Sequence, residues 1–149
     1  MANFAKVTPI NMGDERNKFL SSSLTLASGV FTACASNGAG TPKYGAYFEM
    51  TERDDKYLIL IKNANASSAA KDVTIKAGGN KIFGSGNDLV YADLAAGDIQ
   101  MVKIDSGRFK CTENVPALAT LANISSTKGC VVIEGESTDI QVAVIKMPA

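Results

Sequence analysis

The second half of the chain, residues 72–149, alternates short apolar segments with turns rich in Gly, Asn and Asp. Regular spacing of such segments between turn signals is typical of the strands of an all-β sandwich or barrel. The last segment carries apolar side chains on both faces, Ile140, Val142 and Val144 on one and Ala143, Ile145 and Met147 on the other. It therefore predicts a strand in the middle of a sheet.

Three other segments also predict strands. Tyr57 to Ile61 is a continuous apolar run between turn signals, which indicates a strand buried on both faces. Val73 and Ile75 alternate with polar residues, which indicates a half-exposed strand. Ser106 to Lys110 is expected to begin another strand, with an inward phenylalanine between solvated cations. Regular spacing predicts about nine or ten strands in all.

Only residues 114–122 have a helical pattern. Asn114 is a candidate N-cap, Pro116 suits the first turn, and Leu118 and Leu121 fall on one face, so the segment predicts one or two helical turns. The expected fold is all-β: a single antiparallel β-sandwich or jelly-roll-like domain with an extended N-terminal arm and at most one short helix. Residues 1–20 form the arm or an edge strand, because Pro9 lacks an amide donor, and residues 21–149 form the sandwich.

Composition excludes several classes of function. Fifteen basic and fifteen acidic residues give a net charge of zero, which disfavours nucleic-acid binding through phosphate neutralisation. The chain has no histidine, which excludes catalytic triads and zinc sites that use it. No apolar run is long enough for a membrane span, and the N-terminus lacks the pattern of a secretory signal peptide. No cofactor site is recognisable, and no nucleophile is paired with a base, so the prediction is a protein that is not an enzyme.

The three cysteines, Cys34, Cys111 and Cys130, are widely spaced and odd in number. An odd count argues against a complete disulfide framework. We therefore expect buried free thiols in a protein made in a reducing cytoplasm.

Two acidic groups offer alternatives to a purely structural role. Asn87 and Asp88, with Asp93 and Asp98 nearby, have oxygen ligands suited to calcium, but their spacing matches no EF-hand. Glu134 and Glu136, with Asp139 close by, resemble the paired carboxylates of a glycosidase, but the chain has no Trp to stack on a sugar. In both groups turn formation is the favoured interpretation, because Asn, Asp and Gly are common turn residues.

Five segments form one series of strands and turns: Leu58-Ile-Leu-Ile-Lys-Asn63, Val73-Thr-Ile-Lys-Ala-Gly78, Leu94-Ala-Ala-Gly97, Ser106-Gly-Arg-Phe-Lys110 and Val142-Ala-Val-Ile-Lys-Met-Pro148. Together they resemble the head decoration proteins of tailed bacteriophages, also called auxiliary or cement proteins. The similarity covers about 90 residues as a pattern rather than a diagnostic motif. The loop at 35–44 and the segment 111–129 depart from the pattern, so they are candidates for contacts peculiar to this protein.

The resemblance implies a structural protein on the capsid exterior of the virion, made in the host cytoplasm. Its partner would be the major capsid protein, whose neighbouring subunits it would bridge, and a homotrimer would be the favoured assembly. It implies no nucleic-acid or membrane partner. The residues expected to contact the partner come from the arm and the loop at 35–44: Phe4, Val7, Pro9, Ile10, Asn37, Lys43 and Tyr44. The alternative is a carbohydrate- or surface-binding module of a phage fibre or tail, which would use Tyr44, Tyr47 and Tyr91.

Overall fold

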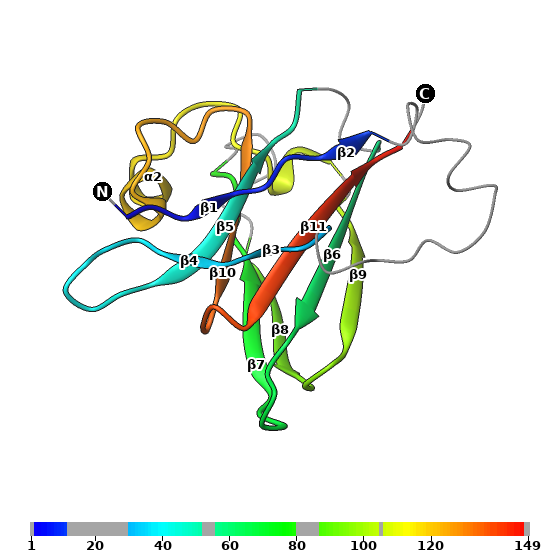
Figure 1. Ribbon diagram of the computed structural model, residues 1–149. Coiled ribbons are helices and arrows are strands. Elements are labelled where there is room, and N and C mark those ends of the chain that lie inside the picture. Colours follow the sequence, from blue (N-terminus) through cyan, green and yellow to red (C-terminus); the bar gives the residue numbers. More distant parts are fainter. Residues whose placement is uncertain (1, 12–29, 52–55, 80–86, 105, 148–149) are drawn as a thin grey trace.

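The computed structural model describes residues 2–11, 30–51, 56–79, 87–104 and 106–147, in which two β-sheets pack together (Figure 1). Sheet A has the order β1-β5-β10-β7-β8, with β4 beside β5. Sheet B has the order β2-β11-β6-β9, with β3 beside β11. The prediction of an all-β sandwich is confirmed. The finer expectation of a jelly roll is not confirmed by this strand order.

The strands are short, and most pairings are antiparallel. Those of sheet A are β1 (Ala5–Lys6), β4 (Ala35–Ser36), β5 (Tyr44–Glu49), β7 (Lys71–Ile75), β8 (Leu89–Leu94) and β10 (Cys130–Gly135). Those of sheet B are β2 (Ile10–Asn11), β3 (Thr32–Ala33), β6 (Tyr57–Asn63), β9 (Ile99–Lys103) and β11 (Ile140–Lys146). Two pairings are parallel instead: β1 with β5 and β2 with β11.

The main core lies between the sheets and follows the period of two in the sequence. Val73 and Ile75 of β7 are fully buried there, as predicted. Strand β11 is central, because it pairs with β6 on one side and with β2 and β3 on the other. Its two predicted faces are both confirmed: Ile140, Val142 and Val144 enter the main core, whereas Ala143 and Ile145 belong to a separate cluster with Leu60.

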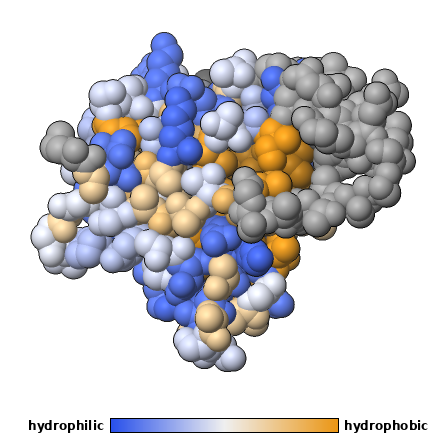
Figure 2. Space-filling view, in the orientation of Figure 1, coloured by the Kyte–Doolittle hydropathy of each residue, from blue (hydrophilic) through white to orange (hydrophobic). Residues whose placement is uncertain are grey.

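Each sheet therefore also carries apolar side chains on its outer face. On sheet A they form a small second core of Phe4, Cys111, Leu118, Ala122 and Val132. On sheet B they are Leu60, Ala143 and Ile145, with Val30, Phe31 and Leu58 packed against them. Figure 2 shows strong hydrophobic colour where β11 and β6 run in Figure 1.

The N-terminal segment is not a free arm. β1 lies at the edge of sheet A and β2 at the edge of sheet B, so one short segment crosses from one sheet to the other. Phe4 is 1% exposed and Val7 is 2% exposed. The expectation that these two side chains contact a partner is therefore wrong, because the chain buries both of them in its own cores. The charged stretch at 14–18 and the rest of the expected arm lie outside the described residues.

The predicted helix forms as α2 (Pro116–Ala122). Its expected cap is wrong: Val115 is the N-cap residue and makes no side-chain capping bond, while the Asn114 Oδ1 accepts hydrogen bonds from Thr127. The strand expected to begin at 106–110 is also wrong, since Ser106–Arg108 form a 3-10 turn and residues 109–110 form a bend. Phe109 nevertheless points into the core, as its apolar character predicted.

Candidate binding surface

Three segments that are far apart in the sequence meet at one end of the sandwich, on the outer side of sheet A (Figure 1). They are residues 2–7, 35–44 and 111–129, and we call their meeting place the three-segment end. The Phe4 amide donates to the carbonyl of Ala122 at 2.9 Å, and the Asn123 side chain donates to the carbonyl of Ala2 at 2.6 Å. These bonds fix the N-terminal segment to the end of α2.

Asn37 attaches the third segment. Its Nδ2 donates to the Leu121 carbonyl at 2.9 Å, which satisfies one of the free carbonyls at the end of α2. Its Oδ1 accepts from the amides of Ala39 and Lys43, both at 3.1 Å, and so closes the loop between them. Asn37 is buried, with 8% of its surface exposed. The expectation that it contacts a partner is therefore corrected: its amide group is used to build the end.

A tight turn brings residues 111–129 back into sheet A. The Cys130 amide donates to the Thr127 carbonyl, and Gly129 has φ of 78°, as the third residue of a type II turn requires. Gly129 then donates to the Cys111 carbonyl, and Cys111 donates to the Cys130 carbonyl. This is the bond pattern of a bulge that begins with a left-handed glycine. It explains why a glycine stands at this corner.

All three cysteines are free and buried, as predicted: Cys111 and Cys130 lie at this corner, and Cys34 lies in the main core. Burial raises the pKa of Cys34 to about 12 and that of Cys130 to about 11. Burial also raises the pKa of Cys111, although a hydrogen bond with Thr127 lowers that pKa in part. Because the thiolate is the reactive form, all three thiols are poor nucleophiles at neutral pH.

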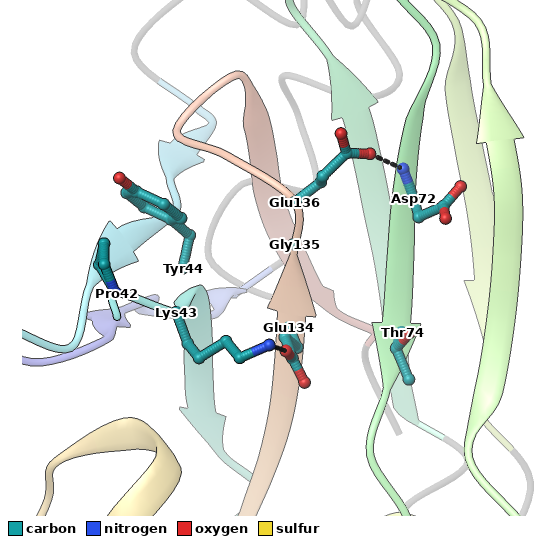
Figure 3. Close-up of a pocket in the computed structure, with 8 residues that line it drawn as sticks. All are labelled: Pro42, Lys43, Tyr44, Asp72, Thr74, Glu134, Gly135 and Glu136. Carbon is teal, nitrogen blue, oxygen red and sulfur yellow. Dashed lines mark hydrogen bonds and ion pairs between the residues drawn. The ribbon is translucent and has the colours of Figure 1, made fainter. Parts of the chain in front are cut away.

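A groove of about 260 Å³ opens beside the three-segment end (Figure 3). Strands β5, β7 and β10 and the loop before β5 position its walls. Tyr44 and Pro42 line one side, whereas Asp72 and Thr74 come from β7 on the other. Lys43, Glu134, Gly135 and Glu136 complete the lining. The groove thus combines an aromatic wall with hydroxyl, carboxylate and ammonium groups.

Ion pairs across the strands hold the groove together. Glu134 lies 3.7 Å from the Lys43 ammonium and 3.8 Å from that of Lys76. Glu136 lies 3.6 Å from Lys71 and accepts a hydrogen bond from the Asp72 amide at 3.0 Å. The two carboxylates considered for glycoside hydrolysis therefore both have partners within the sheet.

The structure places the remaining predicted contact residues in two different parts of the molecule. Lys43 and Tyr44 both line the groove, and the Lys43 side chain is 56% exposed. Pro9 and Ile10 are partly exposed and lie elsewhere, since Ile10 pairs with Ile145 at the edge of sheet B. Tyr47 and Tyr91, which the alternative function invokes, are half-buried against the two cores of sheet A.

The other candidate sites have structural partners as well. Asp88, considered for calcium, accepts hydrogen bonds from the Lys76 ammonium and the Ala77 amide, both at 2.7 Å. Across the described ranges, no three acidic or cysteine side chains are placed to hold a metal ion. The helical part of the described chain offers no segment long and apolar enough to cross a membrane.

Sequence reasoning missed Asp72 and Thr74 as groove residues. The alternation of β7 indicates that both side chains leave the core on the same face. Which strand lies beside them depends on pairing: Thr74 is opposite Glu134, and Glu134 is opposite Gly45. Periodicity gives the face of a side chain but not its neighbour across the sheet.

Comparisons with protein-family models, with curated proteins and with solved structures find no match for this chain.

Proposed function

We propose that this chain is a structural protein that binds the outside of a tailed-bacteriophage capsid and bridges neighbouring major capsid subunits. One observation carries the proposal: the three-segment end joins the N-terminal segment to the two regions that depart from the family pattern. Hydrogen bonds at Ala122, Leu121 and Ala2 lock these segments together. The end is therefore preorganised, which lowers the entropy cost of binding.

The surface of the three-segment end suits a protein partner. Small or uncharged residues outnumber charged ones among its exposed positions: they include Ala2, Asn3, Gly38, Ala39, Gly40, Thr41, Pro42, Ala117, Thr120 and Asn123, whereas the exposed charged residues are Lys6, Lys43, Glu113 and Lys128. Charged residues are depleted in the core of protein interfaces, and short side chains let a partner backbone approach closely. Many copies on a symmetric shell bind through multivalency, so each contact can be weak. The resemblance also implies a homotrimer, which light scattering of the purified protein would test.

The test uses shells assembled from a major capsid protein encoded in the same genome as this chain. Thr41→Trp places a large side chain on the exposed loop of the three-segment end without touching the core. We expect co-sedimentation of this variant with the shells to fall at least about tenfold, since the bulky ring blocks close approach. The matched control is Ala66→Trp, at an exposed position between β6 and β7, which should bind like the wild type.

Two results would contradict the proposal. One is wild-type protein that does not bind the shells. The other is a Thr41→Trp variant that binds and stabilises them as well as the control does.

A second candidate, a carbohydrate-binding module of a fibre or tail, is favoured by the groove. Tyr44 forms one side of the groove and faces Thr74 and Asp72 across β10, and an aromatic wall with a few polar groups is a common ligand-binding arrangement. Glycan-array binding that is lost in Thr74→Val, together with no binding to shells, would support this function over the first.

A further inference from the structure

The strand at the free edge of sheet B exposes apolar side chains. β9 is the last strand in the order β2-β11-β6-β9, so only one of its edges is paired within the described part of the sheet. Val102 enters the main core, which places Ile99, Met101 and Lys103 on the outer face. Ile99 is 42% exposed and Met101 is 64% exposed. Both are large hydrophobic residues that gain free energy when a partner covers them.

Inward from these exposed residues the outer face of sheet B is also apolar, but Leu60, Ala143 and Ile145 are buried there, with Val30 and Phe31 packed against them. Met101 lies opposite Leu60, which in turn lies opposite Ala143. Lys103 lies opposite Leu58, and Ile99 lies opposite Lys62. The outer positions of β6, β9 and β11 thus form an apolar stripe with a lysine at each end and no carboxylate: Leu58, Leu60, Lys62, Ile99, Met101, Lys103, Gln141, Ala143 and Ile145. We call these nine positions the β9 stripe.

The free edge of sheet A differs from this one. β8 pairs with β7 through a register shift between Lys71 and Val73, and Asp93 has φ of 56°. Bulges and irregular residues of this kind protect edge strands against pairing with other chains. β9 carries no register shift against β6 and no residue with positive φ. It is therefore the edge better suited to accept another strand.

We propose that β9 binds an extended segment of the partner protein by strand addition, and that this segment carries apolar side chains flanked by Asp or Glu. Main-chain hydrogen bonds would provide affinity, and Ile99 and Met101 would contact the apolar residues. Lys62 and Lys103 would attract the flanking carboxylates. The inference rests on the proposed capsid-binding function and deepens it, because bridging two subunits requires a second contact away from the three-segment end.

Charge argues against a second copy of this chain as the occupant. In a two-fold antiparallel pairing centred on Met101, Lys103 of each copy would lie opposite Ile99 of the other. Ile99 is itself opposite Lys62 in β6. Such a pairing would bring together lysines from both copies with no carboxylate in the stripe to match them, so it lacks the charge complementarity that favours a partner.

Shell binding tests the stripe directly. Met101→Ser removes the most exposed apolar side chain, and Lys103→Glu reverses one charge. We expect each to weaken binding to the assembled shells by about fivefold to tenfold, because truncating one central contact of an interface commonly has an effect of this size. Val90→Ser is the matched control, since Val90 is 57% exposed but lies on β8; it should bind like the wild type. Circular dichroism checks that all three variants are folded.

Crosslinking identifies the occupant. Met101→Cys labelled with a benzophenone maleimide reacts selectively, because the three native thiols are buried. After irradiation on the shells, mass spectrometry should find the label on an extended capsid segment with apolar residues between Asp or Glu. Crosslinks to another copy of this chain would overturn the inference, as would unchanged binding of both stripe variants. If Thr41→Trp fails to bind while the stripe variants bind normally, only the β9 inference is wrong. If wild-type protein does not bind, the proposed function fails with it.

Discussion

At the scale of single residues, several positions are fixed by what lies against them. Gly45 is the clearest case, because Phe4 packs directly over it on the outer face of sheet A. A Cβ added at Gly45 would lie 2.3 Å from the Phe4 ring and 2.4 Å from the Ile133 carbonyl oxygen. The carbonyl belongs to the sheet and cannot move away. Glycine is therefore needed here for space, and the need arises from residues 41 positions earlier and 88 positions later.

We expect Gly45→Ala to lower the free energy of unfolding by about 1–3 kcal/mol, the usual cost of overpacking a core. Urea denaturation would measure it. Gly40→Ala is the control: nothing lies within 4 Å of its added Cβ, so its effect should stay within about 0.5 kcal/mol. Equal stability of the two variants would contradict the account of Gly45.

Asn63 shows a second kind of constraint. It is fully buried, its Nδ2 donates to the carbonyls of Ala69 and Leu94, and its Oδ1 accepts from the Asn65 amide. The amide group ends β6 inside the protein and satisfies backbone groups of two segments, the loop that follows β6 and the end of β8. Only the tertiary structure brings Leu94 of β8 to this position.

At the scale of elements, α2 depends on a side chain outside the helix. The Val115 amide donates to the Thr127 Oγ1 at 2.8 Å, and that hydroxyl lies 3.3 Å from the Asn114 Oδ1. Thr127 is fully buried. A threonine from the following loop thus accepts from the amide of the N-cap residue, the bond that the N3 side chain makes in a capping box.

Thr127→Val keeps the shape of the side chain and removes its hydroxyl. We expect it to lower the free energy of unfolding by about 1–3 kcal/mol, because buried polar partners are left unsatisfied. The same exchange at the exposed Thr120, within α2, should change stability by less than about 0.5 kcal/mol. Calorimetry of the two variants would distinguish a structural role for Thr127 from a general effect of valine.

The carboxyl group of Asp88, which lies between β7 and β8, should make the stability of the fold depend on pH. Burial opposes ionisation of Asp88, but hydrogen bonds from Lys76 and Ala77, with the charges of Lys76 and Arg108, outweigh it and hold the Asp88 pKa below the ordinary 3.8. A depressed pKa stabilises the fold above the pKa of the unfolded chain, and this contribution is lost as pH falls through the folded pKa.

Asp88→Asn should therefore be less stable than the wild type at pH 6, by no more than about 1 kcal/mol because the pair is partly exposed to solvent. The two proteins should converge as pH falls from the ordinary aspartate pKa of 3.8 through the lower pKa that Asp88 has in the folded protein. Urea titrations at several pH values would measure both. A stability difference that persists at pH 2 would show that Asp88 acts through its shape rather than its charge.

At the scale of the whole molecule, the N-terminal segment ties the two sheets together. It pairs with β5 through β1 and with β11 through β2, and it contributes Phe4 and Val7 to two different cores. A deletion of this segment is consequently a poor test of capsid binding, because it removes part of the fold. Single substitutions at exposed positions such as Thr41 separate binding from folding.

Deleting residues 1–8 should lower the free energy of unfolding by at least about 3 kcal/mol, the smallest loss usual for truncating a buried phenylalanine. Deleting only residues 1–3 removes the exposed Ala2 and Asn3 and should have a much smaller effect. Denaturant unfolding of both truncations measures the difference. A residue 1–8 deletion as stable as the full chain would show that the segment is a dispensable arm after all.

The sequence by itself determined which side chains are buried in β6, β7 and β11, that one short helix follows Asn114, and that the thiols are buried and free. These properties follow from the local period of two or of 3.6 and from residue type, which a chain carries wherever it folds. Only the tertiary structure decided that the N-terminal segment folds into its own sheets, that Asn37 supports α2, and that Glu134 lies between Gly45 and Thr74. Such pairings join residues distant in sequence, and their register depends on how all the strands pack at once.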